Sequence, residues 1–395
     1  MRVTRCAWVG VAAMVLLGGC KGFWDATSTS GGSGSYPASG VFYVLNEKTT
    51  QLVAYQFAAS SNGPTTLAGS PYTIGALPYT MAISPSGSFL YVSTVGGIYV
   101  YSVGTGGALT IANGGAVISQ DAAYAMHVDP SGTWLVEVVS GQGTVNAVPI
   151  SASSGLFDST RVEESAALPT ITISQLAMSP ANSANPYVFV AMGSGGTAVI
   201  PFTATNTASH TSPFGTVGNI ALINTAGGAN AVAVDPSNRL LYVGETVAVS
   251  GTQTGGLRVF TIGATSDITE ITGSPYSTGG TGPSAILPGT SLVYVANKAV
   301  SGSTDGNITG FTLATSGTTT ITYSLTTISS IAAGISTMAL SSDSTTTYIL
   351  AANSGGSPDL STFTFDATTT GKLDAAAVVT TGTDPVQAVS VVGLP

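Results

Sequence analysis

One strand–turn–strand pattern recurs along this chain and constrains its fold more than any other feature. Its clearest copy has apolar residues at 231–234 and 240–243, joined by the turn Asp235-Pro236-Ser237-Asn238. Proline presets φ for a turn, and Asp, Ser and Asn side chains hydrogen-bond the turn's own backbone. Short runs of β-favouring residues on both sides of such a turn predict two antiparallel strands.

The pattern returns about every fifty residues. Further copies begin at Tyr79, Tyr124, Gln175, Ser284 and Thr337. Aligning the first strands makes seven positions equivalent, at intervals of 45 to 56 residues: Ala82, His127, Ala177, Ala233, Ala285, Ala339 and Ala388. Repeats of this length, each with room for four short strands, predict the blades of a propeller.

The two ends of the repeat region complement each other. Residues 386–392 match the first strand of the repeat, but no second strand follows them. Residues 41–45 match a second strand, but no first strand precedes them in the repeat region. We therefore expect an all-β, seven-bladed β-propeller closed by a C-terminal strand that completes the first blade. The sequence Gly-Ser-Pro-Tyr at 69–72 and 273–276 is expected in outer fourth strands, where an edge tolerates proline.

The first forty residues have a different character. Arg2 and Arg5 precede an apolar run, 7–17, that is too short to span a bilayer comfortably. The ending Leu-Gly-Gly-Cys20 resembles a bacterial lipobox, which implies a lipid anchor on Cys20. The expected organisation is a lipoprotein signal peptide at 1–19, a flexible Gly/Ser-rich tether at 20–39 and the propeller at 40–395. The expected location is the cell envelope, as an outer-membrane lipoprotein facing the periplasm or the outside.

Composition excludes several kinds of partner and chemistry. Charged residues make up only 7% of the chain, and removal of Arg2 and Arg5 takes the net charge from −9 to −11. Without a basic cluster, nucleic acid is not an expected partner. Two cysteines and two histidines, His127 and His210, are too few for cysteine–histidine catalysis or a histidine-rich zinc site. We predict no cofactor and no metal site.

Three segments carry a family resemblance: Tyr-Val-Leu-Asn at 43–46, Ser-Pro-Ser-Gly-Ser-Phe-Leu-Tyr-Val-Ser at 84–93 and Asp-Pro-Ser-Asn-Arg-Leu-Leu-Tyr-Val at 235–243. They resemble the repeats of the seven-bladed lactonase family, which includes 6-phosphogluconolactonase-type propellers and YVTN-repeat surface proteins. The resemblance covers residues 40–395. It implies a lactonase fold and, in an active member, Pro-His or Arg-His just before such first strands. This chain has Tyr79, Tyr124 and Asn230 in those places.

Candidate site residues gather at one expected mouth of the central channel. Tyr79, Tyr124, His127 and Asn230 are the candidate binding residues, since a polar mouth with a lone histidine suits a small molecule. The alternative, which we favour for His127, is that it fills a gap and bonds a neighbouring backbone or water. His127, Glu47 and Glu245 are the weak catalytic candidates. For both glutamates the favoured alternative is a solvated loop charge.

Two functions remain open. The first is a lipid-anchored binding or scaffold module that takes a small-molecule, glycan or protein ligand at the propeller mouth. The second is a lactonase-type hydrolase, 6-phosphogluconolactonase-like, acting on a sugar lactone there. The family resemblance favours the hydrolase, and the replaced histidines favour the binding module. Whether the protein is an enzyme stays open at this point.

Overall fold

The computed structural model describes residues 40–57, 64–139, 141–181, 183, 185–205, 211–220, 228–246, 256–263, 268–300, 303–318, 320–342, 348–355, 357–380 and 384–391. The predictions that concern the signal peptide, Cys20, the tether and His210 lie outside the described residues. No helix in the described part of the chain is long and apolar enough to cross a membrane.

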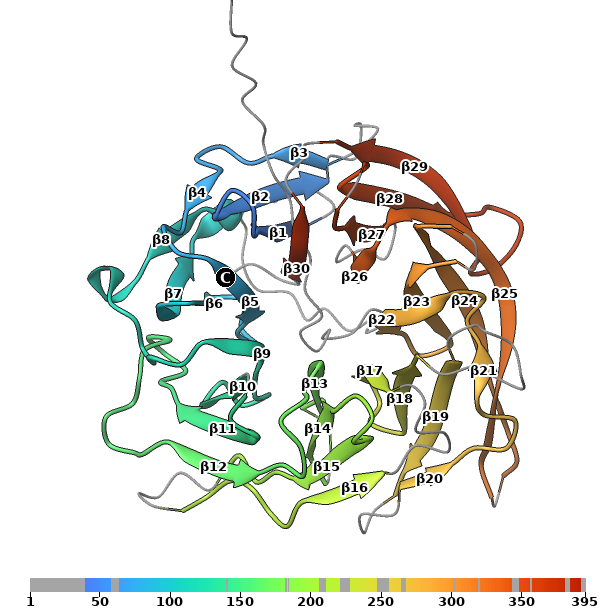
Figure 1. Cartoon of the computed structure of the whole chain (residues 1–395), viewed down its shortest axis with the longest axis horizontal. Helices are drawn as coiled ribbons and strands as arrows, with labels where there is room; N and C mark the ends of the chain where they lie inside the picture. Colours follow the sequence, from blue (N-terminus) through green and yellow to red (C-terminus); the bar gives the residue numbers. More distant parts are fainter. Residues whose placement is uncertain are drawn as a thin grey trace, which may run out of the picture.

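The strands form seven antiparallel sheets, set around a common axis as the blades of a ring (Figure 1). Blade 1 contains β30 (Pro385–Val391), β1 (Val41–Asn46), β2 (Gln51–Phe57) and β3 (Pro64–Thr66), with β4 (Tyr72–Thr73) beside β2. Blade 2 contains β5 (Pro78–Ile83), β6 (Phe89–Thr94), β7 (Gly97–Val103) and β8 (Leu109–Ile111). Blade 3 contains β9 (Ala123–Val128), β10 (Trp134–Val139), β11 (Thr144–Pro149) and β12 (Glu164–Ala167). Blade 4 contains β13 (Gln175–Met178), β14 (Tyr187–Ala191), β15 (Thr197–Pro201) and β16 (Gly218–Ile220).

The remaining three blades follow the same order from the axis outwards. Blade 5 contains β17 (Ala229–Val234), β18 (Leu240–Glu245), β19 (Gly256–Ile262) and β20 (Ile268–Glu270), with β21 (Tyr276–Ser277) beside β19. Blade 6 contains β22 (Thr281–Pro288), β23 (Leu292–Ala299), β24 (Asp305–Ser316) and β25 (Thr322–Ile335). Blade 7 contains β26 (Thr337–Ser342), β27 (Tyr348–Asn353), β28 (Leu360–Phe365) and β29 (Leu373–Val379). Two short 3₁₀ turns, Thr105–Gly107 and Asn113–Gly115, flank β8.

The C-terminal strand closes the ring, as predicted. β30 pairs antiparallel with β1, with Ala388 opposite Val44, and so supplies the inner strand of blade 1. The seam is also bridged by Asp384, which accepts a 3.1 Å bond from Lys48 Nζ and a 3.0 Å bond from the Gly355 N–H of blade 7. This pairing covers the inner edge of β1, which would otherwise be left without a partner strand.

Apolar side chains between neighbouring blades form the core. Leu135 and Val148 of blade 3, for example, share a buried cluster with Tyr91 and Val100 of blade 2. Burial of each such side chain contributes about 1.5–3 kcal/mol. The sheets therefore hold together face to face, and each blade depends on both neighbours.

In three blades, a tyrosine of the second strand forms a hydrogen bond to the next blade. Its hydroxyl donates to the carbonyl of a glycine in the outer hairpin of the next blade. The three bonds, 2.7 to 3.0 Å long, join Tyr43 to Gly107, Tyr91 to Gly155 and Tyr294 to Gly371. These glycines have positive φ, and a Cβ on Gly371 would lie 2.6 Å from Leu292 Cδ2, so the hydrogen bond requires glycine.

The Gly-Ser-Pro-Tyr sequences do not lie within fourth strands as expected. In each, Gly-Ser-Pro forms a turn that interrupts the outer strand, and only the tyrosine lies in a strand, as the first residue of β4 in blade 1 and of β21 in blade 5. Because proline has no N–H and the turn breaks the ladder, the serine hydroxyl replaces a backbone acceptor. Ser274 Oγ accepts the Val259 N–H at 3.0 Å, and Ser70 Oγ accepts that of Ala54 at 2.8 Å.

Candidate functional site

Most inner strands contain a β-bulge near their start, where one extra residue has no partner on the second strand. In β5, Pro78 opposes Thr94 and Thr80 opposes Ser93, so Tyr79 is the extra residue. The same register shift makes five further residues the bulged ones: Tyr124, Asn230, Ser284, Met338 and Val386. Bulges of this kind turn a side chain out of the regular alternation. Tyr79, Tyr124 and Asn230 thus take the same place in the inner strands of blades 2, 3 and 5.

The register also corrects the alignment of the inner strands. Measured from the bulge, the positions equivalent to Ala82 and His127 are Ala177, Ala233, Leu287, Ser341 and Val389. The predicted equivalents Ala285, Ala339 and Ala388 were therefore wrong by one or two residues. The copies in blades 6, 7 and 1 lack the Ser-Pro or Asp-Pro turn that anchors the alignment in blades 2 to 5. His127 consequently stands in a position of mixed residue types, and does not interrupt a run of alanines.

Tyr79 and Tyr124 stack on each other across blades 2 and 3. Their ring centroids are 4.5 Å apart with planes 20° from parallel, and Tyr124 is 48% exposed. The pKa of Tyr79 is raised, first by desolvation, then by Tyr124 and then by the negative charge of Glu47. Glu47 is exposed in the turn after β1. Three candidates from blades 1, 2 and 3 thus lie at the same end, and each tyrosine hydroxyl can donate or accept a hydrogen bond.

Asn230 has a structural role at the equivalent position of blade 5. Its Nδ2 donates a 2.6 Å bond to the Pro283 carbonyl in the inner strand of blade 6. Ser284 repeats the arrangement, since its hydroxyl donates a 2.5 Å bond to the Thr337 carbonyl of blade 7. In blades 5 and 6 the bulged side chain thus forms a hydrogen bond to the inner strand of the next blade. In blades 2 and 3 an aromatic stack takes the place of that hydrogen bond.

His127 lies apart from the tyrosine pair. It follows Tyr124 by three residues, about 10 Å along an extended strand. Its Nδ1 lies 2.7 Å from the Val128 carbonyl and therefore donates a hydrogen bond, and its Nε2 is buried with no partner among the described residues. The pKa of His127 is lowered by burial, against the opposing effects of the Val128 carbonyl and Asp129. A neutral imidazole bonded to its own backbone suits packing better than proton transfer.

Glu245 is not the solvated loop charge that the sequence suggested, because it is 2% exposed. Both its carboxylate oxygens accept bonds from Arg258, at 2.8 and 2.9 Å, and Arg258 also donates to Glu270 at 3.1 Å. Burial raises the pKa of Glu245, and Arg258 opposes this shift. Glu245, Arg258 and Glu270 all belong to blade 5, whereas His127 belongs to blade 3. Glu245 is thus held by a structural ion pair, whereas Glu47 is the exposed charge that was expected.

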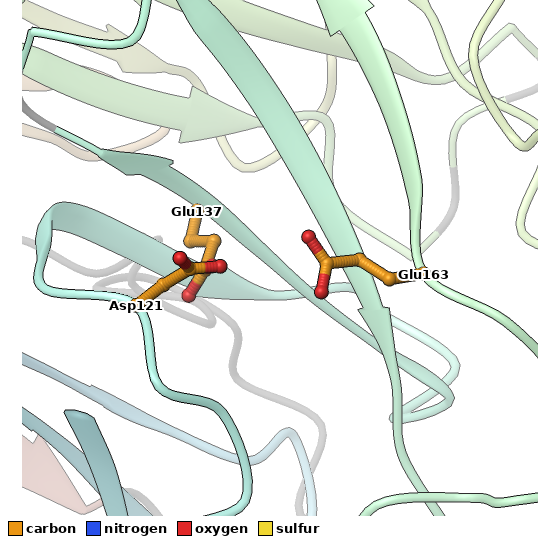
Figure 2. Close-up of side chains that lie close together, drawn as sticks. All are labelled: Asp121, Glu137 and Glu163. Carbon is orange, nitrogen blue, oxygen red and sulfur yellow. The ribbon is translucent and has the colours of Figure 1, made fainter.

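Sequence reasoning missed a cluster of three carboxylates in blade 3 (Figure 2). Asp121 precedes β9, Glu137 lies in β10 and Glu163 precedes β12, and one oxygen of each lies within 4.8 Å of those of the other two. Glu137 is fully buried, and the other six blades have an apolar residue at its position: Val44, Val92, Val190, Val243, Val295 and Ala351. The signal was present, because Val136-Glu137 replaces the Tyr-Val of the repeat.

Comparison with solved structures places the fold among propellers described as lactonases. A proposed 6-phosphogluconolactonase from Bacteroides fragilis superposes with a TM-score of 0.65 at 13% identity, over 89% of this chain and 98% of that one. One from Bacteroides uniformis gives 0.66 at 14%, over 89% and 99%. The periplasmic gluconolactonase PpgL of Pseudomonas aeruginosa gives 0.61 at 14%, over 91% and 100%. No family model and no curated protein matches the sequence. The chain is a seven-bladed β-propeller that shares the architecture of these lactonase-like proteins.

Proposed function

We propose that this protein is a lipid-anchored binding protein of the cell envelope, whose ligand docks on the stacked Tyr79–Tyr124 pair. The observation that carries the proposal is the 48% exposure of Tyr124 on a ring of otherwise smaller or tied side chains. Tyrosine offers a broad, rigid contact surface with a polar tip and loses little conformational entropy on binding.

The chemistry of this end of the ring favours a neutral glycan. The exposed aromatic face packs against the C–H face of a sugar ring, and the tyrosine hydroxyls and the Glu47 carboxylate accept hydrogen bonds from sugar hydroxyls. The tyrosines are uncharged, so affinity has to come from stacking and hydrogen bonds. A glycan ligand also suits a protein held at the cell surface by Cys20.

The lactonase alternative has weaker support. Hydrolysis of a lactone needs a group that can take a proton from water within hydrogen-bond reach of the reacting carbon. His127 is bonded to its own backbone, and Glu245 is held by Arg258. Glu47 is the one earlier catalytic candidate that stays exposed near the tyrosines.

A glycan array, followed by calorimetry on the sugars retained, tests the proposal on the full chain. We expect Tyr124→Ala and Tyr79→Ala to weaken binding at least tenfold. Phe157→Ala is the matched control, because Phe157 is 40% exposed and belongs to the same blade but pairs with Ile150 near the other end of β11. Equal binding by Tyr124→Ala and the wild type would contradict the proposal. Lactone turnover that is lost in Glu47→Gln would favour the hydrolase instead.

The anchor is tested separately. Metabolic labelling with a fatty acid should mark the wild-type protein and leave Cys20→Ala unlabelled, and cell fractionation should move that variant out of the membrane fraction. Several acyl chains would hold the protein durably, at about 0.8 kcal/mol per buried methylene. Equal labelling of the two proteins would overturn the anchor and leave the tyrosine site untouched.

A further inference from the structure

Three carboxylates of blade 3 converge at a place where no described lysine or arginine pairs with them. Figure 2 shows Asp121 and Glu137 close together and Glu163 pointing toward them from the outer strand. Every ion pair formed by the described lysines and arginines involves other carboxylates. Even Arg161, two residues from Glu163, is bound to Asp158 and to the carbonyls of Thr133 and Ile150. The cluster therefore needs either protons or an external cation.

Glu137 is the residue that makes this cluster unusual. It is 0% exposed, and neither of its carboxylate oxygens forms a hydrogen bond of good geometry with a described residue, although the Asp121 carboxyl group and the Asn146 amide lie beside it. By the alternation of the strand it shares a face with Leu135, which packs in the core between blades 2 and 3. A buried charged group without a partner costs several kcal/mol, so an unfilled arrangement of this kind is expensive.

Blade 5 shows how the same fold satisfies such a group from within. Arg258 in blade 5 and Asn146 in blade 3 occupy the same repeat position in the third strand. Arg258 pairs with Val243 and Asn146 pairs with Glu137, and Val243 and Glu137 are themselves equivalent. The outer glutamates are equivalent as well. In blade 5, Glu270 pairs with Phe260. In blade 3, Ala147 pairs with Glu164, so the preceding residue, Glu163, faces the position that corresponds to Phe260. In blade 5 the arginine binds Glu245 and Glu270. In blade 3 an asparagine amide stands in its place, beside three carboxylates.

We propose that Asp121, Glu137 and Glu163 bind a Ca²⁺ ion. Ca²⁺ takes six to eight oxygen ligands at 2.3–2.6 Å, so oxygens on opposite sides of it lie about 5 Å apart. The three carboxylates fit within that span. Glu163 is exposed and leaves the ion accessible to water, which completes its coordination. Nitrogen and sulfur donors, which zinc prefers, do not belong to the cluster.

The ion would join blade 3 to the loop that leads in from blade 2. Asp121 lies in that loop, two residues after Ser119, whose carbonyl accepts the Ile98 N–H of blade 2 at 2.9 Å. It also lies three residues before Tyr124. Ca²⁺ would therefore fix the backbone that carries one half of the tyrosine stack. The inference itself does not depend on which ligand the tyrosines take.

Calorimetric titration of the metal-depleted full chain with CaCl₂, together with thermal unfolding, tests the site. We expect one site per chain and a higher melting temperature with Ca²⁺. Glu137→Gln and Glu163→Gln should each weaken binding at least tenfold, because each removes a charged ligand. Glu137→Val introduces the residue of the sister blades, so it should fold and its melting temperature should not respond to Ca²⁺.

Glu270→Gln is the matched control, since it alters the equivalent glutamate of blade 5 and should keep the full response to Ca²⁺. The proposal is overturned if the wild type shows neither heat of binding nor a change in melting temperature with Ca²⁺. It is also overturned if Glu137→Val responds to Ca²⁺ as the wild type does, because the ion would then bind elsewhere.

Discussion

The hydroxyl of Tyr294 in blade 6 donates a 2.7 Å hydrogen bond to the Gly371 carbonyl of blade 7. Tyr242, its counterpart in blade 5, is equally buried but its hydroxyl has no partner among the described residues. The outer hairpin of blade 6 is formed by the long strands β24 and β25, of 12 and 14 residues, whereas the strands β28 and β29 of blade 7 have 6 and 7. Two tyrosines in one repeat position thus differ in a single hydrogen bond.

This difference predicts opposite outcomes for the same substitution. Tyr294→Phe should lower the free energy of unfolding by about 1–2 kcal/mol, since it removes a bond and leaves a carbonyl unsatisfied. Tyr242→Phe should be neutral or slightly stabilising, because it removes a buried hydroxyl without a partner. Urea unfolding of both variants measures the contrast. Equal losses would mean that the bond to Gly371 adds nothing.

The triad of Glu245, Arg258 and Glu270 in blade 5 gives a second prediction. Arg258→Met should destabilise the protein by about 3–5 kcal/mol, because it leaves Glu245 charged and buried without its partner. Arg239→Met is the control: Arg239 is 35% exposed, and its buried partner Asp235 keeps the backbone N–H donors of residues 239 and 240, so the loss of the arginine should cost about 1 kcal/mol or less. Denaturant unfolding of the two variants provides the comparison. A loss for Arg258→Met as small as that of the control would show that water reaches Glu245.

The acidic cluster predicts a pH dependence of stability. Burial, followed by the hydrogen bonding and charge of the adjacent Asp121 and by the charge of Glu163, raises the pKa of Glu137 well above its usual range, and the Asn146 amide opposes this shift. As the pH rises above the ordinary carboxyl pKa, the unfolded chain releases this proton before the folded one does, so metal-free protein loses stability.

The variant Glu137→Gln isolates the contribution of Glu137 to this pH dependence, because a glutamine side chain does not titrate. In metal-depleted buffer we expect the wild type to lose stability relative to this variant between about pH 5 and pH 8, and saturating Ca²⁺ to reverse the loss. Urea unfolding at the two pH values measures the difference. A difference that stays constant with pH would mean that Glu137 titrates as an ordinary glutamate.

Ring closure predicts a strong effect of a short truncation. Deletion of residues 386–395 removes nearly all of β30 and exposes the edge of β1, so the protein should aggregate or unfold at a much lower temperature. Lys48→Ala is the control, since it removes only the seam ion pair, in which Lys48 is 60% exposed. That variant should lose about 1 kcal/mol or less. A truncated protein that melts like this control would contradict closure by β30.

The sequence was informative where the repeat kept its turn. Asp235-Pro236 and its counterparts set the strand pairs, and the orphan strands at 41–45 and 386–392 required each other, so blade number and closure were predictable. The alignment failed in blades 6, 7 and 1, where no Ser-Pro or Asp-Pro turn marks the register. A bulge shifts the register by one residue, and no local pattern distinguishes Ser284 from Ala285 as the bulged one.

The site was predictable only in part. Tyr79 and Tyr124 were expected at one end because they share a repeat position, but their stacking depends on two bulges in adjacent blades. Glu245 was read as exposed because it ends a strand, and its burial follows from Arg258, thirteen residues away. Asp121 and Glu163 meet Glu137 from separate loops. That contact depends on the packing of blade 3 against the incoming loop, which spacing along the chain does not encode.

The central claim is that blade 3 departs from the repeat to make a site, and crystals of the protein grown with CaCl₂ test it most directly. An anomalous difference map should show a peak among Asp121, Glu137 and Glu163, with oxygen ligands at about 2.3–2.6 Å. In crystals of Glu137→Val grown in the same way, the peak should be absent. A map of the wild type without that peak, in which Glu137 and Asp121 share a proton, would contradict the account.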